Sequence, residues 1–146
     1  MKTYLRLIIA IIVGCGAFAI TGNAQTSGAQ TIRARIPFTF TVGDKTLPAG
    51  VYTVSILNPA SDRNALQLRS EDGRVSAIVQ TGRVKCAHAA SARLLFHRYG
   101  DSYFFANAQM AGDVTSLAAT KTRAERATQR ALRQRGDGST VAILAE

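Results

Sequence analysis

The chain has 146 residues, a length typical of one domain, and 47% of them are hydrophobic. Its formal net charge of +9 favours anionic surroundings without specifying a fold. Only two cysteines are present, which excludes a framework of several disulfides, and the nine acidic residues offer few candidates for a pair of catalytic carboxylates.

Residues 1–24 have the three parts of a secretory signal peptide. A short basic start precedes an apolar stretch, and the small residues Gly22 and Ala24 precede the expected cleavage point. The apolar stretch is shorter than the about 20 residues that a membrane-spanning helix needs. We therefore expect an exported protein, periplasmic or extracellular, with a flexible leader at 25–30 and no transmembrane segment after processing. Loss of two basic residues lowers its net charge from +9 to +7.

A lipid anchor is the alternative to cleavage after Ala24. The stretch "IVGC" resembles a bacterial lipobox, in which Cys15 would be lipidated and become the mature N-terminus. However, the apolar stretch continues past Cys15 to Ile20, whereas lipoproteins usually turn polar there. In the cleaved form Cys86 is the only cysteine, so no disulfide can form within one chain.

Residues 31–112 alternate between apolar and polar side chains, which predicts a mainly β domain. We expect an antiparallel sandwich or curled sheet of about six or seven strands. In the first strand, "RIPFTFTV", Pro37 has no backbone N–H to donate, which predicts an edge position or a bulge. The following loop, "VGDKTLPAG", is interpreted as two reversals with Leu47 directed inward and Gly50 able to take a positive φ, and not as a ligand site.

Two further hairpins are predicted in this region. The first turns at Asp72-Gly73 in a type I′ turn, which pairs Leu68 with Ala77 and Leu66 with Val79. The second turns at Gly100-Asp101 in a type II′ turn, which places Phe96 opposite Phe105 and Arg98 opposite Tyr103 as a cation–π pair. Both faces of the second of these hairpins are substantially apolar. Each face therefore needs a cover, and self-association is one way to provide it.

Residues 113–146 are predicted to contain a linker, a basic helix and a terminal strand. "TRAE", residues 122–125, has capping-box spacing, and Gly136 is a natural C-terminal stop. The helix presents an apolar strip that we expect to pack on the sheet, formed by Ala124, Ala127 and Ala131. Another face, within roughly 80 degrees, gathers four basic side chains: Arg123, Arg126, Arg130 and Arg133.

Four segments indicate a resemblance to a known group: "IPFTFTVGDKTLPAGVYTV", "LRSEDGR", "LLFHRYGDSYF" and "KTRAERA". They occur in this order in an uncharacterised group of small exported proteins from soil bacteria of the acidobacterial type, which the chain resembles over nearly all of its mature region. The most specific part is the F-x-V-G-x(3)-L-P-A-G-x-Y-x-V motif at Phe40 to Val54. That group has no established activity, so the resemblance implies export and a β fold and transfers no catalytic residue.

The arginine-lined helix face is the leading candidate site. We expect a non-enzymatic structural or binding module of the cell envelope that contacts an anionic component (lipid head groups, polysaccharide or phosphate) through Arg123, Arg126, Arg130 and Arg133. The alternative is a solvated helix face without a partner. Nucleic acid is disfavoured by export and by the lack of interleaved aromatic residues, and large apolar anchors for membrane insertion are missing.

The competing hypothesis is a small secreted enzyme or metal-dependent protein that uses Cys86, His88 and His97. Cys86 and His88 are two residues apart and would face the same side of an extended segment, as a thiolate–imidazole pair requires. However, a "C-x-H" pair with one distant histidine matches no common zinc arrangement and lacks a fourth ligand. We therefore expect no catalytic residue, no metal and no cofactor.

Overall fold

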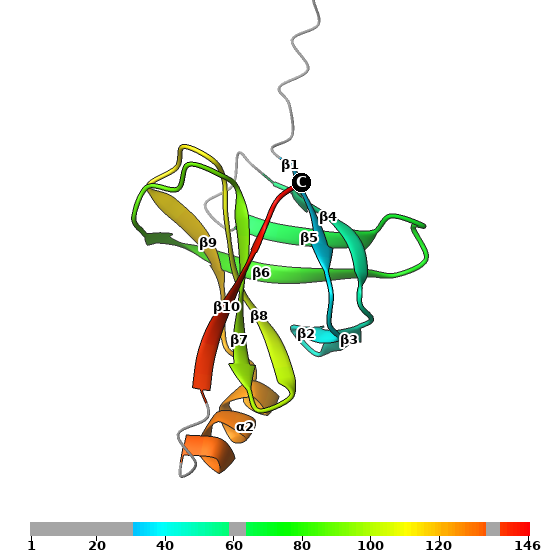
Figure 1. The fold of residues 1–146 in the computed structure, drawn as a ribbon, viewed down its shortest axis with the longest axis vertical. Coiled ribbons are helices and arrows are strands. Elements are labelled where there is room, and N and C mark those ends of the chain that lie inside the picture. The colour runs from blue at the N-terminus through cyan, green and yellow to red at the C-terminus, as the bar shows by residue number, and fades with distance from the viewer. Residues whose placement is uncertain (1–30, 59–63, 134–137) are drawn as a thin grey trace, which may run out of the picture.

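The computed structural model describes residues 31–58, 64–133 and 138–146, without the side chain of residue 133 (Figure 1). The predicted signal peptide, the leader at 25–30, Cys15 and Gly136 lie outside the described residues. In chain order the elements are β1 (Thr31–Ile36), β2 (Phe40–Val42), β3 (Lys45–Leu47), β4 (Gly50–Ile56), β5 (Asn64–Ser70), β6 (Ser76–Lys85), β7 (Arg93–Tyr99), β8 (Ser102–Gln109), β9 (Thr115–Ala119), α2 (Arg123–Arg133) and β10 (Gly138–Leu144). Within this part of the chain no helix combines the length and the apolar character needed to cross a membrane.

The strands of these ranges all belong to one open, mixed sheet. Its path runs β1-β4-β5-β6-β9-β8-β2-β3, and the β7–β10 pair branches from β8. Neighbouring strands are antiparallel except β2, which pairs in parallel with β8 at Thr41 and Phe104. The sheet curls far enough for the chain after β10 to reach β1: the backbone N–H of Glu146, two residues beyond the end of β10, donates to the carbonyl of Arg33 at 2.9 Å.

The predicted sandwich or curled sheet of six or seven strands is only partly correct. In the described residues the domain is mainly β with one helix, but the sheet has ten strands there and is not a clear sandwich. Pro37 ends β1, so the predicted first strand is divided into β1 and β2, which occupy distant places in the sheet. The predicted loop after β2 contains β3, and the region predicted as a linker contains β9, which joins β6 to β8.

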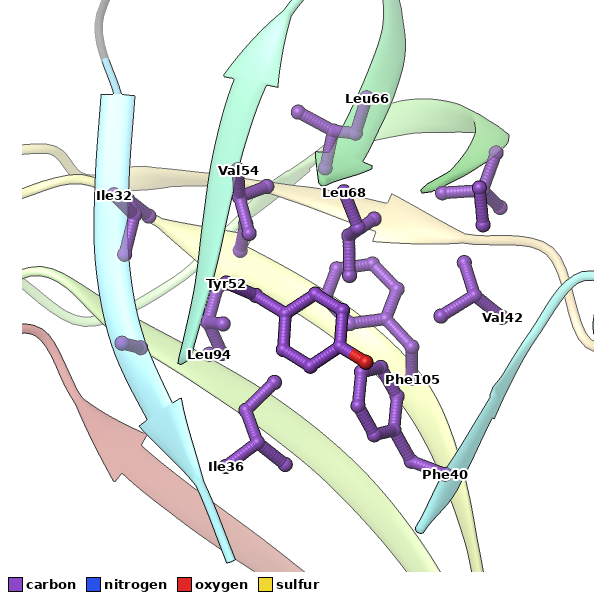
Figure 2. Close-up of a cluster of buried hydrophobic side chains, with 14 of the residues drawn as sticks. Ile32, Ile36, Phe40, Val42, Tyr52, Val54, Leu66, Leu68, Leu94 and Phe105 are labelled. Carbon is purple, nitrogen blue, oxygen red and sulfur yellow. The ribbon is translucent and has the colours of Figure 1, made fainter. Parts of the chain in front are cut away.

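One hydrophobic core fills the concave side of the sheet. Figure 2 shows side chains from β1, β2, β4, β5, β7 and β8 directed toward one another around Tyr52. Leu66 and Leu68 are completely buried, and the aromatic rings of Phe40 and Tyr52 meet edge to face with centroids 5.2 Å apart. Burial of apolar area on this scale is the main stabilising contribution to the fold.

The registers of the two later hairpins are confirmed. Leu68 pairs with Ala77, Leu66 with Val79, Phe96 with Phe105 and Arg98 with Tyr103, and the Arg98 guanidinium lies 5.8 Å from the Tyr103 ring centroid. The type I′ prediction at Asp72-Gly73 is wrong, because only Gly73 has a positive φ and a type I′ turn needs two. The positive φ of Gly100 fits the predicted type II′ turn.

Candidate functional site

The basic helix begins where the sequence predicts. The Thr122 hydroxyl accepts a hydrogen bond from the backbone N–H of Glu125 at 3.1 Å, which is the arrangement of an N-cap. Residues with good helix propensity follow, and an acidic residue in the first turn complements the positive end of the helix dipole. The helix is therefore fixed at its start both by local hydrogen bonding and by charge.

α2 does not dock through its alanine strip. Ala124, Ala127 and Ala131 are exposed, which contradicts the prediction that they pack on the sheet. The face turned toward the sheet carries Glu125, which is 3% exposed, and the half-buried Leu132. Small alanine side chains bury little apolar area, whereas the Glu125 carboxylate finds hydrogen-bond partners on the sheet.

The carboxylate of Glu125 joins the helix to β7. His97 Nδ1 lies 2.7 Å from Glu125 Oε1 and donates to it, and the Tyr99 hydroxyl donates to the same oxygen at 3.4 Å. The Nζ of Lys121 donates to the Tyr99 hydroxyl at 3.1 Å and lies 5.8 Å from the centre of its ring. We call His97, Tyr99, Lys121 and Glu125 the docking cluster.

The docking cluster explains how the β7–β8 hairpin is covered. The inward face of this hairpin belongs to the core, and on its other face Tyr99 and Phe104 are buried with ring centroids 5.9 Å apart. Figure 1 shows α2 at the lower end of the molecule, beside the tip of β7 and β8. The cover that this face needs is thus supplied, at least at the hairpin tip, by the same chain.

The arginines of α2 lie on the exposed part of the helix surface. Arg123, Arg126 and Arg130 are exposed, and the side chain of Arg133 is outside the described residues. Among the other exposed arginines in the described part of the chain, three have a carboxylate partner: Arg33 pairs with Glu71, Arg35 with Glu146 and Arg74 with Asp72. The other three, Arg69, Arg83 and Arg98, have none and lie apart on β5, β6 and β7. Within the same residues, Arg123, Arg126 and Arg130 have no ion pair, and Arg126 donates to the backbone carbonyl of Lys121 at 2.8 Å.

The residues of the competing hypothesis lie on different elements. Cys86 follows β6 and is half-buried, His88 is exposed in the next loop, and His97 lies on β7 against Glu125. The described residues contain no group of three or more histidine, cysteine and acidic side chains arranged to hold a metal ion. No hydrogen bond joins Cys86 to either histidine in that part of the chain, so nothing there forms a thiolate–imidazole pair.

The "LPAG" motif lies beside the Asp72 turn. Together they line a cleft of about 390 Å³, and the Tyr52 hydroxyl donates to the Pro48 carbonyl at 2.8 Å. Gly50 pairs with Ile36 in the β1–β4 ladder and does not take a positive φ. The Asp72 carboxylate is used within its own turn: the hydrogen bond from Ser70 and then the backbone N–H of Arg74 hold the pKa of Asp72 below its ordinary value. The motif mainly shapes two neighbouring turns.

Sequence reasoning missed the docking cluster. His97 and Tyr99 are two residues apart and therefore share one face of a predicted strand, and Lys121 directly precedes the N-cap. The position of each residue within its own element could thus be predicted from the sequence. What the pattern did not contain is the contact between His97 and Glu125, which are 28 residues apart. A glutamate at the N3 position of a capping box is ordinarily expected to hydrogen-bond to the backbone at the start of its own helix.

Comparison with known proteins gives no assignment. No family model, curated protein or solved structure matches the chain. The resemblance to small exported proteins of acidobacterial-type soil bacteria therefore stays a prediction.

Proposed function

We propose that this protein is a non-enzymatic binding module of the cell envelope that contacts an anionic surface through the arginine face of α2. The observation that carries the proposal is the gathering of unpaired arginines on one helix face. Arg123, Arg126 and Arg130 are exposed without carboxylate partners in the described residues. The other exposed arginines without such partners in the same residues are spread over three strands, with Arg69 on β5, Arg83 on β6 and Arg98 on β7. An unneutralised cluster of one sign is the surface that attracts an anionic partner.

The way α2 is docked supports the same function. The helix is attached through Glu125 and Leu132, on the side opposite the arginines at 100 degrees per residue. The binding face is therefore held by contacts that a partner need not disturb. Because α2 has exposed alanines and no exposed large apolar side chain in the described residues, attachment to lipid would be electrostatic and superficial.

Vesicle binding tests the proposal. The processed chain, residues 25–146, should sediment with vesicles containing phosphatidylglycerol and not with vesicles of phosphatidylcholine alone, and the binding should weaken steeply with added salt. A basic residue near an anionic surface contributes about 1 kcal/mol. Replacing Arg123, Arg126 and Arg130 with glutamine should therefore weaken binding by about 3 kcal/mol, which is more than a hundredfold.

A charge-matched control separates position from net charge. Arg69, Arg74 and Arg83 are exposed on β5, β6 and the turn between them, away from α2. Replacing these three with glutamine removes the same charge and should leave vesicle binding within a fewfold of the original. Equal loss in both triple variants would show that only net charge matters and would refute the helix site.

Anionic polysaccharide provides the second arm of this test. Retention on heparin beads with little vesicle binding would assign the surface to a polysaccharide, whereas binding to vesicles alone would assign it to lipid head groups. Binding to neither at low salt would refute the proposed function.

A further inference from the structure

A second cleft borders the flank of α2 that carries Gln129, next to the arginine face. It has a volume of about 280 Å³ and lies between the helix and the β7–β10 pair, lined by His97, Tyr99, Lys121, Gln129 and residues 138–140. We call it the α2 cleft. Its floor follows from the strand register, because Thr140 pairs with His97 and Gly138 pairs with Tyr99. Cross-strand partners point to the same side of a sheet, so the Thr140 side chain lies next to the His97 ring.

The docking cluster determines which charged groups face this cleft. The Glu125 carboxylate is buried and accepts hydrogen bonds from His97 and Tyr99, so its negative charge is directed into the protein. Glu125 does not line the cleft. Among the described residues, the ammonium of Lys121 is the charged group that does, and it is held by the Tyr99 hydroxyl at 3.1 Å and by Gln129 Oε1 at 3.4 Å. Its third N–H has no partner among the described residues.

Two of the other polar groups that line the cleft in the described residues can donate hydrogen bonds. Gln129 uses its carbonyl oxygen on Lys121, which leaves its amide N–H₂ for a ligand. Thr140 contributes an exposed hydroxyl, and Arg126 adds positive charge nearby through its contact with the Lys121 carbonyl. An ammonium, an amide N–H₂ and a hydroxyl on one small cleft are complementary to a carboxylate, whose two oxygens accept several hydrogen bonds.

From this arrangement we propose that the α2 cleft binds a small carboxylate ligand carrying hydroxyl groups, of the size of a sugar acid. The ammonium of Lys121 pairs with the carboxylate. The hydroxyls of the ligand hydrogen-bond to Thr140 and to the free ring nitrogen of His97. Gly138 keeps the cleft open beside Tyr99, since a side chain there would begin to fill it: an added Cβ would lie 3.8 Å from the ring.

A matched pair of sugars tests the carboxylate directly. D-glucuronate and D-glucose are titrated into ¹⁵N-labelled processed chain at constant ionic strength, and amide chemical shifts are followed. Glucuronate should shift the amides of His97, Lys121, Gln129 and residues 138–140, while glucose at the same concentrations should shift them at least tenfold less. Equal shifts with both sugars would overturn the assignment to a carboxylate, and no shifts with glucuronate would overturn the site.

Two lysine variants locate the charge. Lys121→Met keeps the apolar stem and removes the ammonium, and it should weaken glucuronate binding tenfold or more. Lys85→Met removes an exposed lysine from β6 and should change binding by less than twofold. If Lys121→Met loosens α2, Thr140→Val offers an independent test on β10, with a severalfold loss expected. Unchanged affinity in both Lys121→Met and Thr140→Val would refute the proposal.

Two further outcomes distinguish this site from the arginine face. Shifts confined to Arg123, Arg126 and Arg130 would mean non-specific attraction to the helix, which contradicts the α2 cleft and leaves the proposed surface function intact. Inorganic phosphate that shifts the cleft amides more strongly than glucuronate would overturn the carboxylate in favour of a phosphate. Loss of vesicle binding in the arginine triple variant does not bear on the cleft, so the two proposals fail separately.

Discussion

Glu125→Ala is the substitution that most directly perturbs the attachment of α2. It removes the acceptor of His97 Nδ1 and of the Tyr99 hydroxyl, and it removes the acidic residue of the first helical turn. A hydrogen bond to a charged group contributes about 1.5–3 kcal/mol. A carboxylate near the helix N-terminus adds about 0.3–1 kcal/mol. Because the His97 side chain is 30% exposed and can bind water instead, we expect a loss of about 2–3 kcal/mol.

This loss should appear in the helix before it appears in the sheet. α2 contacts the sheet mainly through β7 and β10, whereas the core lies within the strands. Native-state amide hydrogen exchange measures such local opening. A loss of 2–3 kcal/mol corresponds to a decrease of about 30- to 150-fold in the protection of α2 amides that open with the helix. Core amides in β5 and β6 should keep their protection.

Ala127→Gln is the matched control for this experiment. Ala127 is exposed on α2, and both residues have good helix propensity, so protection should change by less than about 0.5 kcal/mol. If the alanine strip packed on the sheet instead, Ala127→Gln would loosen the helix and Glu125→Ala would be almost neutral. That reversed result would refute the docking described for α2.

Three further predictions concern the sheet and its turns. Leu68→Ala should lower the free energy of unfolding in urea by about 2–5 kcal/mol, because Leu68 is completely buried, and an unchanged midpoint would contradict its place in the core. Gly73→Ala should cost about 1–2 kcal/mol in the same assay, since the φ of +70° suits glycine and the added Cβ would displace the flexible end of Arg69, 2.9 Å away; a neutral result would contradict the turn geometry. Burial first, and then the charge of Asp72, raises the pKa of Tyr52, so the folded state favours the protonated phenol. The contribution of the protonated Tyr52 to the free energy of unfolding is therefore fully present below the pKa of about 10 in the unfolded chain, and it is lost as the pH rises through the raised pKa of the folded state. Tyr52→Phe should lessen this loss of stability at high pH, measured by urea unfolding.

The local hairpins could be predicted because two independent signals agree. In the Asp72 hairpin the turn residues and the alternation of Leu66 and Leu68 fix the same register, although the turn type was wrong. A hairpin loop brings together residues that are close in sequence, so its pairing is readable from a short stretch.

Long-range pairing was not readable in this way. β2 pairs in parallel with β8 over a large sequence separation, and β9 is a five-residue strand in a stretch with no strict alternation. Their positions are set by which edges remain free when the sheet curls, and no short pattern encodes that. The number of strands was therefore underestimated.

The helix illustrates a different limit. Its start and its arginine face follow from local sequence, but its docking side does not, because a hydrophobicity ranking places glutamate in solvent. Glu125 is buried only because His97 and Tyr99 arrive from β7 with donors for it. A buried polar group depends on partners supplied by the tertiary fold.

The orientation of α2 underlies both proposals, because it turns the arginines outward and closes the α2 cleft. Leu132 Cδ1 lies 3.6 Å from the position that a Cβ would take at Gly100, which places the leucine methyl groups against the β7–β8 turn. A ¹³C-edited NOE spectrum of the processed chain should therefore show cross-peaks from the Leu132 methyl protons to the Gly100 α protons, and none from the methyl protons of Ala127 to the sheet. Cross-peaks from Ala127 to β7 or β10, together with no cross-peak between Leu132 and Gly100, would contradict this orientation of α2.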